Sequence, residues 1–285
     1  MTEAAVVLIT GASRGIGAAT AQAFGYAGWR VAVTARTQTE GQVLSHQLRR
    51  ADGSLLAGSL AATVTAVQAT GAPVFAHPMD LMDTTSMDRA LDAVLAHYGR
   101  IDVLINNAVY QDPEINALLL DLDDAMLART LQGNVIAPFH LTRRLLAHMA
   151  QQGKGVVINV CSGAGQSDPP VPANEGGWGF AYGASKAALI RLAGCIRREW
   201  GRQGVRAYSV NPGIVTTEAV SATLGDAGTL VQRYGAMSPD KVAQALLWLA
   251  TSEEAPAMAK GQDMLDLQAL IRTLGLSPPP APNAS

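Results

Sequence analysis

The chain has 285 residues with 21 basic and 23 acidic side chains, a balance that excludes the strongly charged surfaces by which proteins hold nucleic acid or anionic membranes. Cys161 and Cys195 are its two cysteines and have no histidine at ligand spacing, so neither a disulfide nor a metal site is expected. No secretory signal precedes the first apolar run, and no run approaches the roughly 18 residues that span a bilayer, which together favour a cytoplasmic protein.

Apolar, β-branched runs alternate with helical segments along nearly the whole chain. The first run begins at Val6, and six more follow at residues 29–35, 73–76, 103–106, 155–160, 205–210 and 263–267. Seven strands with helices between them predict an α/β fold, a single Rossmann-type doubly wound parallel sheet with helices on both faces. Such folds reach about 250 residues as one unit, so we expect one domain over residues 1–276.

Two connections and the C-terminal end depart from this alternation. Residues 59–71 have a serine cap, apolar residues at helical spacing and a final glycine, which predict a short helix before the third strand. An unusually long polar connection, residues 37–58, precedes that helix. Residues 277–285 contain four prolines, which predict a disordered tail.

The first strand leads into a glycine-rich turn, in which Gly11, Gly15 and Gly17 follow the pattern Gly-x-x-x-Gly-x-Gly. Glycine removes the Cβ atoms that would keep a diphosphate away, and the free N–H groups of the following helix point toward that position. The turn lacks the Gly-Lys-Ser/Thr ending of a nucleotide-hydrolysing loop, so the expected ligand is a dinucleotide. The alternative is an ordinary strand-to-helix turn.

The end of the second strand indicates which dinucleotide is bound. In NAD-binding folds a carboxylate there accepts hydrogen bonds from the adenosine ribose, whereas an arginine accommodates a 2′-phosphate. Arg36 ends this strand, no carboxylate occurs before Glu40, and Arg14 in the glycine turn provides a second cation. These residues predict NADP(H). The alternative is that both are solvated surface arginines.

Asp80 and Leu81 directly follow the third strand, where the adenine base is expected. In this position the carboxylate of Asp80 can accept a hydrogen bond from the adenine amino group. An equally simple role for Asp80 is the N-cap of the next helix, and Asp83 competes for that role. The sequence leaves both roles open.

The chemistry is expected at Tyr182 and Lys186, which stand four residues apart and share one face if this segment is helical. Tyrosine is a poor base at neutral pH because its ordinary pKa is about 10, but a neighbouring cation favours the phenolate. The phenol can then exchange a proton with an alcohol or carbonyl oxygen. Ser162 follows a buried strand and can hydrogen-bond the same oxygen. Taken alone, the Tyr-x-x-x-Lys spacing also fits a helix surface pair.

Together these positions resemble the short-chain dehydrogenase/reductase family, from Val6 to about Leu267. The motifs that carry the resemblance are Thr10-Gly11-x-x-x-Gly15-x-Gly17, Asn106-Asn107-Ala108, Asn134, Ser162, Tyr182-x-x-x-Lys186 and Asn211-Pro212-Gly213. The resemblance implies that Tyr182 is the general acid/base and that Ser162 polarises the substrate oxygen. It also implies that Lys186 assists the tyrosine and holds the nicotinamide ribose, while Asn134 holds a proton-relay water on that lysine.

The resemblance also implies which residues contact the cofactor. Asn107 and Ala108 would line the adenosine side, and the segment that follows Asn211 would hold the nicotinamide and its carboxamide. The full set expected at NADP(H) is Gly11, Ser13, Arg14, Gly15, Ile16, Gly17, Arg36, Asp80, Leu81, Asn107, Ala108, Tyr182, Lys186, Pro212, Gly213, Val215 and Thr217.

The chain departs from the family pattern at three places. Val109 replaces the glycine that usually follows Asn-Asn-Ala, and Tyr110 comes next, which is expected to narrow the cleft. Residues 163–180 are longer than the usual connection and are expected to shape the substrate pocket. Residues 261–268 lack the double glycine common there, which leaves C-terminal packing and oligomer contacts less defined.

The walls of the substrate pocket are expected to come from the segments that leave the carboxyl ends of the strands. Tyr110, Trp178 and Phe180 are the candidate contacts, and they predict a moderately bulky, largely apolar ketone or secondary alcohol. The alternative is that these side chains only pack the loops onto the sheet. Residues 214–237 are expected to close over bound cofactor and substrate.

The predicted function is that of an NADP(H)-dependent oxidoreductase that moves hydride between nicotinamide and a carbonyl/alcohol pair. Two alternatives are a cofactor-binding redox sensor or scaffold without turnover, and the same site used for enoyl reduction, dehydration or epimerisation. The family resemblance implies a homo-oligomer, most often a tetramer. Apolar residues within 118–149 are consistent with an interface, although plain core packing explains them equally well.

Overall fold

A computed structural model describes residues 4–50, 52–224 and 235–277. It contains one parallel sheet of seven strands in the order β3-β2-β1-β4-β5-β6-β7. The strands are β1 (Val6–Thr10), β2 (Arg30–Ala35), β3 (Val74–Pro78), β4 (Val103–Asn106), β5 (Gly155–Val160), β6 (Val205–Asn211) and β7 (Leu265–Asp266). The predicted seven-stranded, doubly wound sheet is therefore confirmed, and its strand order reverses between β1 and β4, where such folds bind their ligands.

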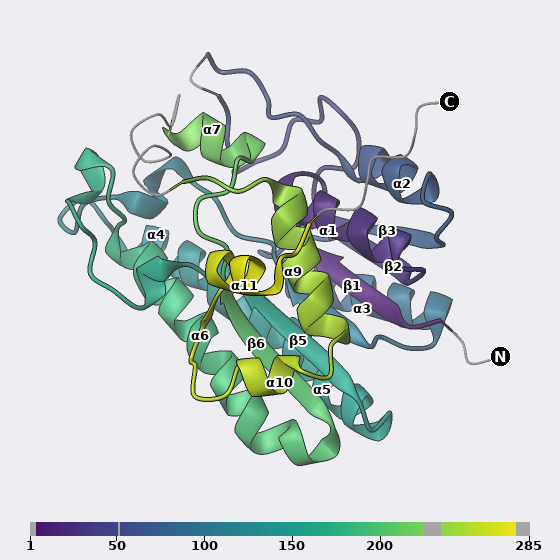
Figure 1. Cartoon of the computed structure of the whole chain (residues 1–285). Coiled ribbons are helices and arrows are strands. Elements are labelled where there is room, and N and C mark those ends of the chain that lie inside the picture. Colours follow the sequence, from purple (N-terminus) through teal and green to yellow (C-terminus); the bar gives the residue numbers. More distant parts are fainter. Residues whose placement is uncertain (1–3, 51, 225–234, 278–285) are drawn as a thin grey trace.

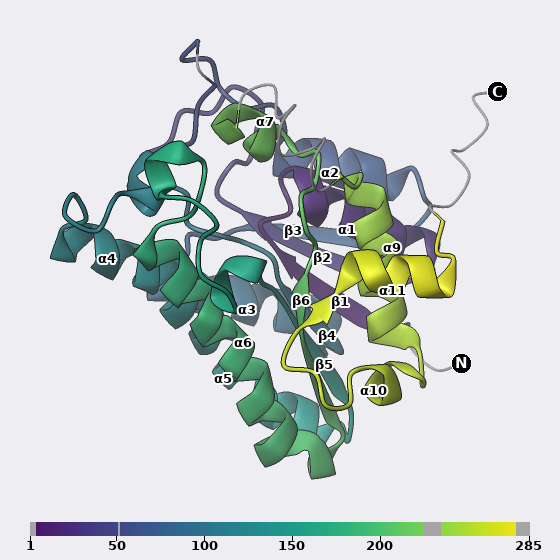
Figure 2. The same cartoon turned by 60° about the vertical axis from the view of Figure 1, so that its left-hand side comes forward.

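Helices cover both faces of this sheet (Figures 1 and 2). Their bounds are α1 (Gly15–Tyr26), α2 (Leu60–Gln68), α3 (Thr84–Tyr98), α4 (Asp124–Leu131), α5 (Ala137–Gln151), α6 (Phe180–Trp200), α7 (Glu218–Leu224), α9 (Pro239–Thr251), α10 (Ala255–Met258) and α11 (Leu267–Leu274). A π-helical turn, Gln132–Ile136, joins α4 to α5. Short 3₁₀ turns lie at Pro113–Asn116, Gly163–Gly165, Ala173–Glu175 and Gly201–Gln203.

The core consists of two apolar layers, one on each face of the sheet. Side chains alternate along a strand, so Val7 and Ile9 of β1 pack with Phe24 of α1 and with α9, whereas Val6 and Leu8 pack with α3, α5 and α6. The central strands β1, β4 and β5 are buried along their whole length. This double burial explains why their sequences show apolar runs without polar alternation.

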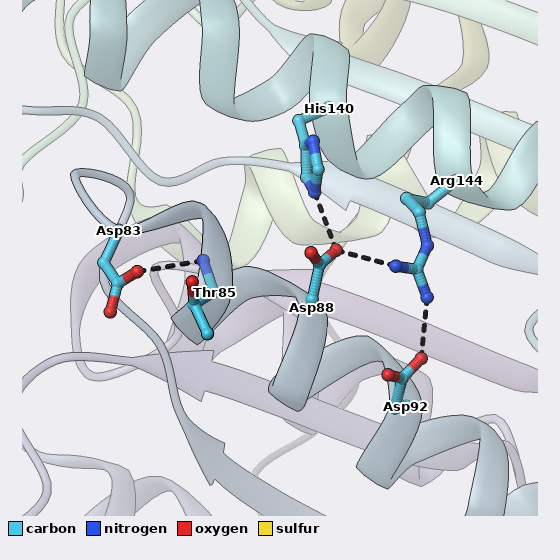
Figure 3. Close-up of polar contacts among 6 residues, drawn as sticks. All are labelled: Asp83, Thr85, Asp88, Asp92, His140 and Arg144. Carbon is cyan, nitrogen blue, oxygen red and sulfur yellow. Dashed lines mark hydrogen bonds and ion pairs between the residues drawn. The ribbon is translucent and has the colours of Figure 1, made fainter.

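The helix predicted within residues 59–71 is confirmed as α2. Ser59 is its N-cap, since its Oγ accepts a hydrogen bond from the Ala62 N–H at 3.1 Å. The N-cap of α3 is Asp83, whose Oδ1 accepts from the Thr85 N–H at 2.9 Å (Figure 3). Asp80 therefore does not cap α3, which removes one of the two roles that the sequence leaves open for it.

A network of charged side chains joins α3 to α5 on the face that these helices cover (Figure 3). Asp88 lies 2.8 Å from His140 Nε2 and 2.8 Å from one Arg144 nitrogen, and the other Arg144 nitrogen lies 2.7 Å from Asp92. The hydrogen bond from His140 holds the pKa of Asp88 below its ordinary value. The network fixes α5 directly after the π-helical turn, which contains Asn134.

Some predictions lie outside the described residues or stay untested. Most of the proline-rich tail, residues 278–285, and part of the expected closing segment, residues 225–234, are not described. The assignment of residues 1–276 to one domain and the cytoplasmic location stay predictions. Within the described ranges, no helix is both long and apolar enough to cross a bilayer, and no group of three or more His, Cys, Asp or Glu side chains could bind a metal ion.

Candidate active site

A cavity of about 950 Å³ opens at the carboxyl ends of the strands. Its lining runs from the glycine turn between β1 and α1 to the segments that follow β4, β5 and β6. Both views of the molecule place α7 and the long segment 37–58 at this end of the sheet (Figures 1 and 2). The predicted residues that line it are Gly11, Ser13, Arg14, Gly15, Ile16, Arg36, Asp80, Leu81, Asn107, Ala108, Tyr110, Ser162, Trp178, Tyr182, Lys186, Pro212, Gly213, Val215 and Thr217.

The glycine turn has the shape required to receive a diphosphate. Gly11 and Gly15 have φ angles of 68° and 55°, in the region that favours glycine. A Cβ atom on Gly11 would lie 2.7 Å from the Ala108 Cα, and one on Gly17 would lie 2.7 Å from the Asn107 Nδ2. The turn therefore requires glycine for its own packing and leaves the N-terminus of α1 open to an anion, so these residues fit a dinucleotide.

Arg14 and Arg36 both line the cavity and both bond to the segment 37–58. Arg14 donates to the carbonyl oxygens of Ala57 at 2.8 Å and Gly58 at 2.9 Å. Arg36 donates to those of Ser45 at 2.9 Å and His46 at 2.7 Å. Burial lowers the pKa of Arg14, which nonetheless remains a cation. The two guanidinium groups are thus held at the cavity by one segment.

The predicted adenosine side is built from the ends of β3 and β4. Asn107 donates through Nδ2 to the carbonyl oxygens of Thr10 at 2.9 Å and Gly11 at 3.1 Å, which ties β4 to the glycine turn. Ala108 donates its N–H to the Thr10 Oγ1 at 3.0 Å. Asp80 accepts from the Met82 N–H at 2.9 Å and still lines the cavity. A contact of Asp80 with adenine stays a prediction.

Tyr182 and Lys186 lie one turn apart at the start of α6, as the sequence spacing predicts. The Lys186 Nζ is 5.7 Å from the centroid of the Tyr182 ring and donates to the Val160 carbonyl at 3.1 Å. Lys186 is 5% exposed, so its charge sits in a largely dry environment beside the phenol. Ser162, which lies two residues after β5, accepts from the Ala164 N–H at 3.3 Å, which leaves its hydroxyl hydrogen to donate. All three side chains line the same cavity.

Asn134 lies in the π-helical turn before α5 and is almost fully buried. Single π turns of this kind occur frequently at functional sites. Its Oδ1 accepts from the Tyr110 N–H at 2.7 Å, and its Nδ2 lies 3.5 Å from the Ser185 Oγ. The Ser185 hydroxyl in turn donates to the Tyr182 carbonyl at 2.8 Å. Asn134 therefore joins Tyr110 to the helix that carries the predicted acid/base, without lining the cavity itself.

The segment after β6 forms the opposite wall. Gly213 has a φ of 69°, and a Cβ there would lie 2.6 Å from the Gln268 Nε2. Val215 is buried and Thr217 packs against Gly15, where a Cβ would lie 3.1 Å from the Thr217 Cγ2. The predicted nicotinamide side thus lies directly beside the glycine turn.

Of the three predicted substrate contacts, the structure brings two to the cavity. Tyr110 and Trp178 line it, whereas Phe180 lies outside the lining and is 56% exposed at the first turn of α6. The Tyr110 hydroxyl donates to the Asp112 Oδ2 at 3.0 Å. Burial, together with this carboxylate, raises the pKa of Tyr110, so the phenol remains a donor.

Sequence reasoning missed several residues of the lining. The segment 37–58 contributes Leu44, His46, Gln47 and Leu48, and the C-terminal region contributes Asp266 and Gln268. Only the unusual length of residues 37–58 signals a special role, because no local pattern indicates where a polar connection will pack.

Comparison with known proteins adds an independent finding. The sequence profile of the family described as short chain dehydrogenase matches residues 5–59 and 54–226. The D-threitol dehydrogenase of Mycolicibacterium smegmatis is 31% identical over 269 residues, which cover 91% of this chain and 90% of that protein.

Solved structures show the same similarity. A metagenomic short-chain oxidoreductase in complex with NADP is 30% identical, with a TM-score of 0.65 over 88% of this chain and 92% of that one. A short chain dehydrogenase from Mycobacterium paratuberculosis bound to NAD has a TM-score of 0.72 over 92% of this chain and 95% of that one. Its identity of 23% supports the fold alone.

Proposed function

Because the chain belongs to the short-chain dehydrogenase/reductase family, we propose that it is an NADP(H)-dependent oxidoreductase that moves hydride between nicotinamide and a carbonyl/secondary alcohol pair. The observation that carries the proposal is the convergence of Ser162, Tyr182 and Lys186 on one cavity that also includes the glycine turn. Of the alternatives, a sensor or scaffold without turnover gives no reason for this convergence.

In this proposal the bound nicotinamide supplies or accepts the hydride, and the side chains manage the proton. The Tyr182 hydroxyl donates its proton to the carbonyl oxygen as charge develops there, and the Ser162 hydroxyl hydrogen-bonds the same oxygen. The Lys186 ammonium, 5.7 Å from the centroid of the Tyr182 ring, places a positive charge beside the ring that carries negative charge after the proton has left. In the reverse direction the phenolate accepts the proton of the alcohol. We favour simple carbonyl chemistry over enoyl reduction, dehydration or epimerisation because the proposed proton donor acts on the oxygen that gains charge when hydride adds to the carbonyl carbon.

The preference for NADP(H) rests on Arg14 and Arg36, which line the cavity from the glycine turn and from the end of β2. Two fixed guanidinium groups can bind a 2′-phosphate through charge-assisted hydrogen bonds. The NADP complex of the metagenomic relative agrees with this preference, although the NAD complex of the mycobacterial structure shows that the fold serves both cofactors.

The proposed substrate is a moderately bulky, largely apolar ketone or its secondary alcohol. Tyr110 and Trp178 support this class because both line the cavity beyond the catalytic residues. Phe180 gives it no support, since it lies outside the lining. We also propose a homotetramer, supported by the exposed Ile136 and Phe139 at the start of α5, which are 46% and 48% accessible in the single chain.

The function is tested by following NADPH oxidation across a panel of carbonyl compounds. Tyr182→Phe should keep the fold and cofactor binding while lowering kcat by at least about 10²-fold, the usual contribution of a general acid. Tyr26→Phe, in an exposed tyrosine of α1, is the matched control and should leave kcat unchanged. Near-normal turnover in Tyr182→Phe would exclude the proposed proton donor.

A further inference from the structure

His46, within the long segment 37–58, has a backbone conformation that its residue type rarely adopts. Its φ is 52°, and no other non-glycine residue in the described ranges has a positive φ. Glycine would adopt this conformation without strain, as Gly41 and Gly53 do in the same segment. A side chain held in this region is maintained by its surroundings, and such positions cluster at functional sites.

The backbone of His46 is fixed at the proposed 2′-phosphate site. Its carbonyl oxygen accepts a hydrogen bond from one Arg36 nitrogen at 2.7 Å, and the carbonyl of Ser45 accepts from the other at 2.9 Å. The two peptide units that flank His46 are therefore both bonded to the guanidinium that would bind the phosphate.

The ring of His46 reaches the substrate side of the cavity. Its Nδ1 lies 3.8 Å from the Asp112 Oδ2, and its centroid lies 5.9 Å from that of Tyr110. Tyr110 donates its hydroxyl to the same Asp112 carboxylate and its N–H to Asn134. His46, Tyr110 and Asp112 all line the cavity. One residue thus contacts both the cofactor-phosphate end and the substrate wall.

We propose that His46 is a positioning residue that couples the 2′-phosphate of NADP(H) to the substrate wall. A phosphate on Arg36 fixes the two peptide units that flank His46, which hold the His46 ring near Asp112 and Tyr110 and so stabilise the position of the substrate wall. NADH lacks that phosphate, so with NADH the wall is held less tightly and the substrate binds more weakly. This inference rests on the proposed function.

The proposed coupling between the 2′-phosphate site and the substrate wall can be measured from either ligand. Coupling between two sites typically changes affinity by about 5- to 150-fold, and each ligand changes the affinity of the other equally. We therefore expect the KM of a large apolar ketone to be at least about fivefold lower with saturating NADPH than with saturating NADH. A substrate-like alcohol should likewise tighten NADPH binding more than NADH binding.

Two variants of His46 test the contribution of its imidazole ring separately from that of its backbone conformation. His46→Gly removes the ring and the strain, whereas His46→Asn removes the imidazole but tolerates the left-handed conformation. Both should bring the ratio of the two KM values close to one, and both should remove the stronger tightening of NADPH binding by a substrate-like alcohol. Val43→Ala is the control, because Val43 lies in the same segment, is 69% exposed and does not line the cavity. It should keep the ratio of the unmodified enzyme.

The outcomes distinguish this inference from the function on which it rests. A chain that binds neither NADPH nor NADH would refute the proposed function. A chain that reduces ketones with equal KM for both cofactors, or whose KM ratio survives in His46→Gly, would overturn the coupling alone. A parallel fall of kcat and melting temperature in both variants, with the KM ratio retained, would show that His46 only stabilises the segment.

Discussion

Gly133→Ala tests whether the wall of the cavity is packed as the structure indicates. Gly133 lies in the π-helical turn beside Asn134, and an added Cβ would lie 3.1 Å from the Tyr110 Cγ and closer still to its Cβ. The Tyr110 Cβ is attached to the backbone, so it cannot rotate away as the end of a flexible side chain can. The backbone at Tyr110 must move, and with it the N–H that donates to the Asn134 Oδ1 at 2.7 Å.

The size of the effect follows from two opposing contributions. Forcing a methyl group into a packed contact costs about 1–3 kcal/mol, whereas alanine is favoured over glycine in a helix by about 1 kcal/mol. Because the Tyr110 Cβ cannot move without its backbone, we expect the clash to dominate, with a net loss of up to about 2 kcal/mol. For a chain of this size that corresponds to a decrease in Tm of up to about 8 °C. Since Tyr110 lines the cavity, the KM of a bulky ketone should rise as well.

Differential scanning calorimetry and steady-state kinetics measure the two effects. Gly201→Ala is the control, because its φ is −61° and an added Cβ would meet nothing within 4 Å. Its Tm should be unchanged or slightly raised. Tyr110→Gly removes the clashing Cβ, so a double-mutant cycle of Gly133→Ala with Tyr110→Gly should give a combined loss smaller than the sum of the two single losses. If Gly133→Ala matched Gly201→Ala in both Tm and KM, the described packing of Tyr110 would be wrong.

Four further predictions follow from the site and the fold. Replacing Arg14 and Arg36 together with neutral residues should weaken NADPH binding more than tenfold relative to NADH in a fluorescence titration, since each charge-assisted bond contributes roughly 1.5–3 kcal/mol; equal affinities in the unmodified protein would contradict the assignment. Trp178→Ala should raise the KM of large apolar ketones more than that of small ones in the carbonyl panel, and an equal change for both would remove Trp178 from the wall. Light scattering at micromolar concentration should give a tetramer mass, whereas a monomer mass would exclude the proposed assembly. Because the pKa of Asp88 is lowered in the fold, its stabilising contribution is complete above its ordinary value of 3.8 and is lost as the pH falls below it; Asp88→Asn should therefore lower the Tm near neutral pH, and a Tm unaffected there would show that the α3–α5 network is not stabilising.

The sheet could be predicted because its pattern is local. Strands such as residues 103–106 and 155–160 are buried on both faces, so they must be continuous apolar runs, and their bounds agree with β4 and β5. The short β7 was expected over residues 263–267, whereas the ladder includes only Leu265 and Asp266. Pairing with the end of β6 limits β7 to these two residues, and the sequence of β7 does not contain that information.

The relative position of Tyr182 and Lys186 could be predicted because helical spacing places the two residues one turn apart in α6. The substrate wall could not be predicted equally well, because it depends on how loops pack. Phe180 and Trp178 are two residues apart, yet Phe180 begins α6 on an exposed face whereas Trp178 faces the cavity. His46 is more distant still in sequence from Tyr110, and only the folded chain brings them together.

The contacts of the two arginines bear on how a phosphate would be recognised. A guanidinium has five N–H donors, and Arg14 and Arg36 each use only two of their nitrogens on carbonyl oxygens of the segment 37–58. Both residues line the cavity and are half-buried. Folding has already restricted their rotamers, which reduces the entropy lost when an anion binds. The segment 37–58 therefore orients Arg14 and Arg36 and leaves some of their N–H groups for a phosphate. The expected preference for NADP(H) over NAD(H) thus depends on this segment as well as on the two arginines.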